Sequence, residues 1–518
     1  MSNKIYPIGI QSFEKIRKNG FFYVDKTALI YQLVSTGSYY FLSRPRRFGK
    51  SLLISTLEAY FKGKKELFTG LAMEQLEKEW TVHPVLHLDL NIEKYGSVES
   101  LENILNDHLL RWEKEFEVDV TTHSPSLRFA NVIRRAYEQT GQRVVILIDE
   151  YDKPLLQSIG NKQVQTELLN TLKPFYGVLK TMDACIRFAL LTGVTKFGKV
   201  SVFSDLNNLR DISMLSMFTE ICGISENELH SCFKEDIEEL AALQQTTYED
   251  VSQKLQTNYD GYHFAPNTGG MYNPFSILNT FANMAFDSYW FETGTPTYLV
   301  ELLKNNDYDL GEVNGVEVGI ETMSGVDATD TDPIPVIYQS GYLTIKDYDP
   351  EFSLYTLGYP NKEVEEGFIK FLVPFYTPIA ESKSGFQVKN FVREVRTGDI
   401  DGFFTRLRSF FSDTTSELVR LQELHYSNVL YIVFKLMGFY TQVEYHTSNG
   451  RIDLVLQTSD YIYVMEFKLH GTAEEALQQI NDKGYTLPFA KDARTLYKIG
   501  VNFSPETRNI DKWVVECR

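Results

Sequence analysis

Residues 41–60 read FLSRPRRFGKSLLISTLEAY, and this stretch decides the fold of the amino-terminal part of the chain. An aromatic and apolar run at 38–43 precedes the loop RPRRFGKS, and apolar residues then recur at helical spacing. A strand, a loop and a helix in this order place backbone N–H groups at the positive end of the helix, where phosphate binds. Gly49, Lys50 and Ser51 match the end of a P-loop, in which the lysine contacts phosphates and the hydroxyl binds Mg²⁺.

The beginning of the same loop departs from the general pattern GxxxxGK[ST], because Arg44 stands at the first glycine position. Arg44, Arg46 and Arg47 bring positive charge where flexible glycine is usual. The sequence leaves open whether these arginines touch phosphate or face acidic partners elsewhere in the protein.

Three further apolar runs are typical of buried strands: 83–90, 144–150 and 186–193. Helical stretches such as 100–116 separate them. Near-continuous apolar strands that alternate with helices predict an α/β fold with a mainly parallel sheet covered on both faces.

The strand at 144–150 continues into the motif IDEYDKP, which ends with the acids that a nucleotide site requires. We expect Asp149 to hold Mg²⁺ and Glu150 to polarise the water that attacks the γ-phosphate. The alternative is that both acids merely form the polar end of a core strand. Their pairing with the GKS loop favours the nucleotide site.

Length and charge bound the organisation of the chain. The 518 residues and 43% apolar content predict two to four domains. The net charge of -18 is uneven: residues 1–200 carry +5, residues 201–400 carry -21 and residues 401–518 carry -2. A polyanion can therefore approach either end, whereas the acidic middle suits a protein partner or self-association.

We predict four regions from these patterns. They are a P-loop core at 1–222, a helical lid at 223–305, an acidic connecting region at 306–400 with a long surface loop at 306–335, and a carboxyl-terminal domain at 401–518. No apolar window is long enough to span a membrane, and no secretion signal is evident, so we expect a cytoplasmic protein without membrane contact. The four scattered cysteines predict neither a disulfide framework nor a zinc ribbon.

Several motifs together resemble the AAA-ATPase-like family of bacterial and archaeal P-loop proteins. They are RPRRFGKS, IDEYDKP, the opening segment IYPIG, FFYVDKT (21–27), LLTGVTKFG (190–198), YDGYHF (259–264) and MYNPFSI (271–277). The resemblance covers about residues 1–280 and makes the arginine-rich loop a family feature. It implies ATP as the nucleotide, bound by the loop residues Arg44, Arg46, Arg47, Phe48, Gly49, Lys50, Ser51 and Leu52 together with Asp149.

Two further residues of the nucleotide site each have two possible roles. Thr192 follows a strand where such folds often sense the γ-phosphate, and it is equally well an ordinary strand-end threonine. Arg210 is either an arginine finger or an exposed helix arginine, and the latter is the simpler interpretation.

A second constellation lies at 442–468, QVEYHTSNGRIDLVLQTSDYIYVMEFK. Three strands joined by the turns SNG and TSD carry Asp453, Glu466 and Lys468, and strand alternation puts the last two on one face. Two acids and a lysine on adjacent strands suit metal-assisted phosphodiester cleavage, with the carboxylates on Mg²⁺ or Mn²⁺ and the lysine positioning water. The alternative is a hairpin with ordinary surface charges.

This pattern resembles the PD-(D/E)XK nuclease superfamily, which implies a restriction-endonuclease-like α/β domain. The helix AEEALQQINDKGY matches the signature of the nuclease domain that accompanies the ATPase family, with Gln479 and Tyr485 at its polar positions. The resemblance also implies an upstream helical acid, Glu423, for which Glu444 is a rival.

These readings support competing functions. The first is an ATPase coupled to a metal-dependent nuclease that cleaves nucleic acid, with DNA as the expected substrate. The second is an ATP-controlled switch or scaffold whose nuclease-like domain binds a partner without cutting. A weaker third is an ATPase whose hydrolysis has degenerated.

Overall fold

The computed structural model describes most of the chain, namely residues 4–159, 161–197, 208–291, 299–300, 302–303, 306, 308–323, 325, 332–377, 381–411, 422–438, 440–448, 451–468, 471–504, 506–507 and 509–517. It describes the backbone alone at 381–386, 422–423, 444–448 and 451–453. The chain forms two compact units, one of residues 1–301 and 315–364 and the other of residues 302–314 and 365–518. The predicted connecting region 306–400 is thus divided between them.

Five parallel strands form the central sheet of the first unit, in the order β2-β3-β4-β1-β5. Their bounds are β1 Tyr39–Ser43, β2 Val85–Asp89, β3 Val144–Asp149, β4 Ile186–Gly193 and β5 Arg210–Asp211. β3 is buried along its whole length, as a strand covered on both faces should be. The predicted parallel sheet is confirmed, and Arg210 lies in the edge strand β5 rather than in a helix.

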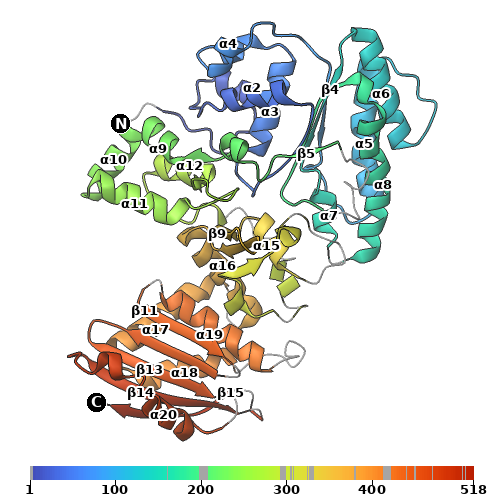
Figure 1. Ribbon diagram of the computed structural model, residues 1–518. Helices are drawn as coiled ribbons and strands as arrows, with labels where there is room; N and C mark the ends of the chain where they lie inside the picture. The colour runs from blue at the N-terminus through green and yellow to red at the C-terminus, as the bar shows by residue number, and fades with distance from the viewer. Residues whose placement is uncertain are drawn as a thin grey trace. The chain divides into compact units, whose positions relative to one another are not determined.

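Helices cover both faces of this sheet, with the group α2 to α4 on one side and α5, α6 and α8 on the other (Figure 1). The helices of this part are α1 Phe13–Lys18, α2 Thr27–Thr36, α3 Lys50–Phe61, α4 Ala72–Leu76, α5 Val98–Glu115, α6 Pro125–Thr140, α7 Lys153–Gln157 and α8 Lys162–Thr181. α6 and α8 pack through the stacked rings of Phe129 and Phe175, 4.5 Å apart. Because all five strands are parallel, their carboxyl ends meet at one edge, where ligands bind in such folds.

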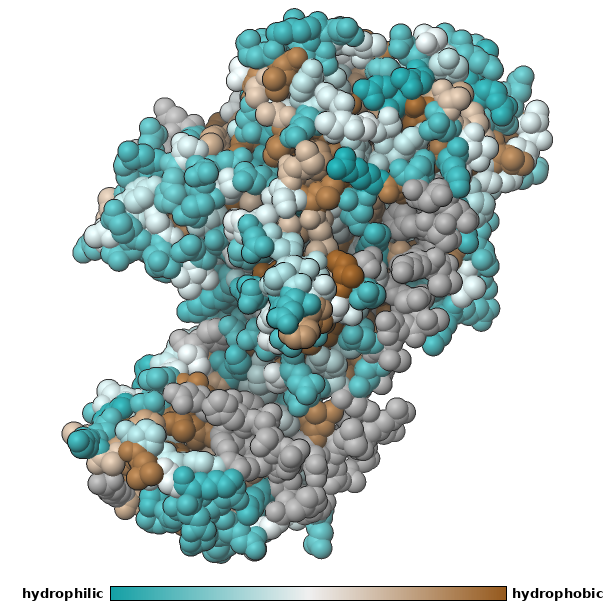
Figure 2. Space-filling model, in the orientation of Figure 1, coloured by the Kyte–Doolittle hydropathy of each residue, from teal (hydrophilic) through white to brown (hydrophobic). Residues whose placement is uncertain are grey.

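The lid contains the expected amphipathic helices, α9 Glu226–Cys232, α10 Lys234–Gln244, α11 Tyr248–Tyr259 and α12 Pro274–Asn283. Their apolar faces share one core, and the outer face of this region seen in Figure 2 is mostly hydrophilic. The region predicted as a helical lid also contains two short strands: β6 Ile224–Ser225 pairs with β7 Met271–Tyr272, and both are buried. Two-residue strands are too short to produce a periodic signal.

The prediction of a surface loop at 306–335 is corrected, because described parts of it belong to a folded segment, residues 315–364. They form a three-stranded antiparallel sheet, β8 Val316–Val318, β10 Leu354–Gly358 and β9 Thr344–Asp349, together with the short helices α14 Ile320–Met323 and α15 Ile334–Gln339. Val318, Met323 and Ile334 are buried. The Gly, Asp and Thr content suggested a loop, but the sparse apolar residues are the ones that reach the core.

The second unit is a sheet in the order β11-β12-β13-β14-β15, in which only the β13–β14 pair is parallel. Its elements are α16 Lys362–Tyr376, α17 Glu381–Thr397, α18 Ile400–Phe411, α19 Gln422–Gly438, β11 Gln442–Ser448, β12 Arg451–Gln457, β13 Tyr461–Lys468, α20 Ala473–Asp482, β14 Thr495–Ser504 and β15 Asn509–Cys517. α20 connects the two parallel strands and packs on one face through Ile480. The opposite face holds Phe503, whose ring stacks 4.5 Å from Tyr426 of α19. The predicted α/β domain is confirmed.

Candidate nucleotide and metal sites

The phosphate loop is curved by two residues in the left-handed conformation, Arg47 with φ 66° and Gly49 with φ 93°. Gly49 is the N-cap of α3, and its carbonyl oxygen accepts the first helical hydrogen bond from Leu53. Successive N–H groups in such a loop make a concave site for anions. Arg47 therefore holds, at a variable position of the loop pattern, a backbone conformation that non-glycine residues rarely adopt.

Arg44 is buried, and its side chain holds the loop in place through hydrogen bonds to the backbone. Its guanidinium donates to the carbonyl oxygens of Ser43 and Ser213, at 2.9 and 2.8 Å, and to that of Phe218 at 3.2 Å. It also lies 3.9 Å from the ring centroid of Phe264. Burial lowers the pKa of Arg44 to about 10. These contacts turn the first arginine of the loop away from the cavity described next.

A large cavity of ≈ 1490 Å³ opens beside the loop. Six of the predicted nucleotide-binding residues line it: Arg46, Arg47, Gly49, Lys50, Ser51 and Leu52. Glu150 is its only acidic residue among those described, against the basic Arg46, Arg47, Lys50, Lys94 and Lys153. In a chain with a net charge of -18, this excess of positive charge marks a site for an anion.

Lys50 is almost wholly buried, and its ammonium lies at the centre of the loop. It donates to the carbonyl oxygens of Arg44 and Pro45, at 3.1 and 3.3 Å, and lies 3.5 Å from Oε1 of Glu150. Glu150 itself has a left-handed φ of 54°, which turns its side chain out of the strand direction. The predicted lysine and the predicted catalytic acid therefore meet in one cavity.

Asp149 and Thr192 form a pair next to Glu150 in the chain and at the end of β4, and neither lines this cavity. The Thr192 hydroxyl donates to Oδ1 of Asp149 at 2.6 Å, and both side chains are buried. Thr192 thus lies against the expected metal-binding carboxylate. Phe48 is also buried, with its ring 4.7 Å from that of Tyr262.

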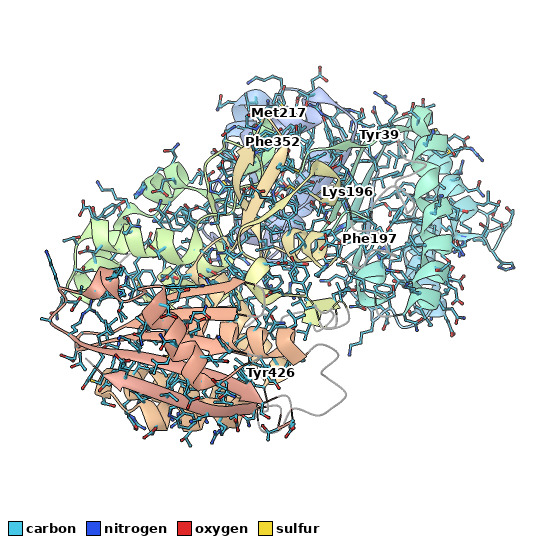
Figure 3. All side chains as sticks on the ribbon, turned by 60° about the horizontal axis from the view of Figure 1, so that its bottom comes forward. Tyr39, Lys196, Phe197, Met217, Phe352 and Tyr426 are labelled. Atoms are coloured by element: carbon cyan, nitrogen blue, oxygen red, sulfur yellow. The ribbon has the colours of Figure 1, made fainter. Side chains whose placement is uncertain are left out.

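The second half of the IDEYDKP motif contacts the loop after β4, which sequence reasoning did not foresee. Oδ2 of Asp152 accepts hydrogen bonds from the backbone N–H of Val194 and from the N–H and hydroxyl of Thr195, at 3.0, 2.6 and 2.8 Å. The next backbone N–H, that of Lys196, donates to Gln339 of α15 at 2.7 Å, and the Lys196 side chain pairs with Asp211. Figure 3 labels Lys196 on the ribbon. The only signal of this contact in the sequence was that the motifs IDEYDKP and LLTGVTKFG occur together.

Two more contributors to the cavity have no obvious role in the sequence. Its apolar wall comes from Pro7, Ile8, Ile10, Phe275 and Leu278, which lie in the quoted segments IYPIG and MYNPFSI or adjoin them. A smaller apolar cavity of ≈ 100 Å³ adjoins it and shares Pro7, Gly49, Leu52, Pro274 and Leu278. Ser340, which also lines the large cavity, belongs to the predicted connecting region 306–400. In the same region, the Tyr342 hydroxyl accepts a hydrogen bond of 3.5 Å from the Arg46 guanidinium.

In the second unit, the strand register brings the two predicted acids together. Asp453 of β12 pairs with Glu466 of β13. Glu466 is wholly buried. It lies on the face that α20 covers, because residues two apart in a strand share a face and Ile462 and Val464 pack against Ile480 of α20. The side chains of Asp453, Glu444 and Glu423 lie outside the described residues; their backbones belong to β12, β11 and the first turn of α19.

Lys468 is the last residue of β13, and Gln479 lies within α20, the helix that connects β13 to β14. Lys468 is half-buried beside Gly471, which has a φ of 120°. Gln479 is half-buried on α20, whose backbone passes directly over Gly500. A Cβ at position 500 would overlap Ala473 and Leu477, so the helix approaches the sheet closely only because this residue is glycine.

The donor set suits a hard cation such as Mg²⁺, which prefers carboxylate oxygens. Glu466 provides a buried carboxylate, and the residue paired with it on β12 is a second acid, Asp453. Among the described residues, no group of three or more His, Cys, Asp and Glu side chains gathers around a point that would hold a metal.

Comparison with known proteins finds a family match in each of the two regions. The family described as "Predicted AAA-ATPase" matches residues 7–203, and the PD-(D/E)XK nuclease superfamily matches residues 421–513. Over 528 aligned residues the chain is 36% identical to "Uncharacterized protein in vnfD 5'region" of Azotobacter chroococcum mcd 1, covering 100% of this chain and 99% of that protein. No solved structure matches.

The chain belongs to the predicted AAA-ATPase family. Its carboxyl-terminal domain belongs to the PD-(D/E)XK nuclease superfamily. Both predicted resemblances are therefore confirmed, and ATP binding follows from the first domain. Within the described parts of the chain, no helix combines the length and apolar character that crossing a bilayer requires.

Proposed function

We propose that this AAA-ATPase hydrolyses ATP in the large cavity and that its nucleotide state controls a Mg²⁺-dependent nuclease, which cleaves DNA. The observation that supports ATP hydrolysis is that Lys50, Ser51 and Glu150 line one positively charged cavity. ATP is a polyanion, and an excess of cations at the carboxyl ends of β1 and β3 suits its phosphates.

The roles of the residues follow from their contacts. Lys50 exchanges its carbonyl partners and Glu150 for phosphate oxygens when ATP binds. Glu150 is then released to orient and polarise the attacking water. Ser51 and Asp149 would hold Mg²⁺, which neutralises charge on the phosphates when bound. Thr192 fixes the orientation of the Asp149 carboxylate, and Arg44 holds the loop in place.

The base of the nucleotide has an apolar site next to the phosphates. Ile8, Ile10 and Phe275 line the large cavity, and the adjoining small cavity is walled by Ile221, Cys222 and Ile224. Both cavities border Gly49, so a nucleotide with its phosphates at the loop can place its base there.

The nuclease half rests on the register of Asp453 with Glu466 and on the neighbouring Lys468. The two carboxylates would hold Mg²⁺, or Mn²⁺, which supplies charge stabilisation at the scissile phosphate. Lys468 positions the attacking water and offsets charge on the phosphate, while Gln479 and Glu423 support the site.

One experiment tests the nuclease. The full chain is incubated with Mn²⁺ and supercoiled plasmid, and Asp453→Ala and Lys468→Ala are compared with the unsubstituted protein. We expect both substitutions to abolish cleavage and to leave ATP affinity unchanged. Undiminished cleavage by both variants would falsify the assignment.

A second function has its own supporting observation, the net charge of -21 in residues 201–400. This acidic region repels DNA and suits a basic protein partner or self-association. In that case the nuclease-like domain is a binding module controlled by ATP. ATP-dependent change of oligomeric state, with no cleavage of DNA or RNA, would favour this function over the first.

A further inference from the structure

We infer that Asn502 is an additional positioning residue of the metal site, whose Oδ1 accepts a hydrogen bond from a water bound to the metal ion. The inference rests on the proposed metal site at Asp453 and Glu466. Asn502 lies in β14, outside the motifs that resemble the nuclease superfamily, and nothing in the sequence pattern points to it.

The position of Asn502 follows from two registers. β14 runs parallel to β13, so that Gly500 pairs with Glu466 and Asn502 pairs with Lys468. In a parallel pair, partners at the same register lie on the same face of the sheet. Gly500 faces α20, and Asn502, two residues further on, faces the same way. Asn502 therefore adjoins both the buried acid and the lysine.

One polar atom of the Asn502 side chain, Oδ1, is buried without a hydrogen-bond partner among the described residues. A buried unpaired acceptor is destabilising, and in native proteins a water or an ion usually occupies the position of the missing partner. The neighbouring side chains at this register include Glu466, the carboxylate that would hold the metal, Lys468, a donor on β13, and Lys512, a donor on β15 that pairs with Glu474.

A hydrated metal ion would supply the donor that Asn502 Oδ1 lacks. Mg²⁺ keeps several waters when one or two carboxylates bind it, and such waters are strong donors. A water on the ion can donate to Asn502 Oδ1 and remain within reach of Lys468, which is where an attacking water is needed. Asn502 thus orients a metal-bound water without touching the metal.

The test measures Mn²⁺ affinity of the full chain without nucleotide, by electron paramagnetic resonance of free Mn²⁺. The Glu466→Gln variant identifies the site whose occupancy is lost. We expect Asn502→Leu and Asn502→Ala to weaken Mn²⁺ binding at that site about 10- to 100-fold. Asn502→Asp, which keeps an oxygen acceptor, should retain the affinity. Asn481→Ala is the control, because Asn481 is exposed on α20 and contacts Glu516.

Thermal unfolding without metal separates positioning from structure. Leucine has nearly the shape of asparagine and removes an unpaired acceptor, so Asn502→Leu should keep or raise the midpoint of unfolding while it weakens Mn²⁺ binding. Full Mn²⁺ affinity in both Asn502→Leu and Asn502→Ala would overturn the inference even if the protein cleaves DNA. Unchanged Mn²⁺ binding in Glu466→Gln would overturn the metal site and the inference together. Loss of affinity in a protein that cleaves no nucleic acid would support the role of Asn502 and contradict the proposed cleavage.

Discussion

The hydroxyl of Thr192, at the end of β4, donates a 2.6 Å hydrogen bond to Oδ1 of Asp149, at the end of β3. This bond fixes the carboxylate that we assign to Mg²⁺, and partners of this kind change activity about 10- to 100-fold when removed. We predict that Thr192→Val lowers the rate of phosphate release from ATP by this factor with little change in ATP affinity. Thr166→Val, on the exposed side of α8, serves as the control. An unchanged rate in Thr192→Val would leave Thr192 as an ordinary strand-end threonine.

The two ends of the arginine loop should respond oppositely to substitution. Arg47→Gly relieves a left-handed conformation that costs a non-glycine residue about 1–2 kcal/mol, so the midpoint of thermal unfolding should stay or rise. ATP affinity should fall, because the cavity loses a positive charge. Calorimetric titration and thermal unfolding measure the two effects separately.

Arg44→Met should instead destabilise the fold. It leaves the carbonyl oxygens of Ser213 and Phe218 without their donor, at about 1–3 kcal/mol for each buried acceptor. Stability unchanged from the unsubstituted protein, together with lost ATP binding, would mean that Arg44 contacts the nucleotide directly.

Asp152 should make stability depend on pH. Burial, followed by the charge of Glu150, raises the pKa of this carboxyl to about 7. The ordinary value for an unfolded chain is about 3.9, so the native state holds this proton between the two values while the unfolded state has lost it. The contribution of Asp152 to stability is therefore fully present below about pH 4 and is lost as the pH rises through about 7.

Asparagine at this position cannot titrate, which provides the comparison. We predict that the unfolding midpoint of the unsubstituted protein falls relative to that of Asp152→Asn as the pH rises from about 4 to about 7. Midpoints in urea at several pH values measure this difference. Parallel pH profiles for the two proteins would mean that Asp152 is ionised throughout.

Glu150→Gln tests hydrolysis alone. The amide keeps the size of the side chain but accepts no proton, and loss of a general base reduces rates about 10²- to 10⁴-fold. Phosphate release should fall by that factor while ATP still binds. Glu167→Gln, at an exposed position of α8, should behave like the unsubstituted protein. Equal phosphate release in both variants would point to degenerate hydrolysis or to a different base.

The strands of the central sheet were predictable because long apolar runs directly report burial. The ends of β1, β3 and β4 therefore lie within two residues of the predicted positions. The phosphate loop was predictable at Gly49 to Ser51, where chemistry restricts the residue type. The direction of the Arg44 side chain was not, since it depends on Ser213 and Phe218, which are distant in sequence.

Residues 315–364 show where sequence patterns fail. Their contacts with the rest of the first unit depend on single residues, such as Gln339 with the backbone of Lys196 and Tyr342 with Arg46. No periodicity marks such contacts, because each involves one residue and a partner in another segment. Asn502 is similar: only the pairing of β14 with β13 brings it beside Lys468.

The most direct test of the central claim is the rate of plasmid cleavage with Mn²⁺ in the presence and absence of ATP, for the unsubstituted protein and for Lys50→Ala. Coupling of the two domains predicts that ATP changes the cleavage rate of the unsubstituted protein. Lys50→Ala should cleave at one rate whether or not ATP is present, because its phosphate loop lacks the ammonium that meets the nucleotide. A cleavage rate of the unsubstituted protein that is identical with and without ATP would contradict the account.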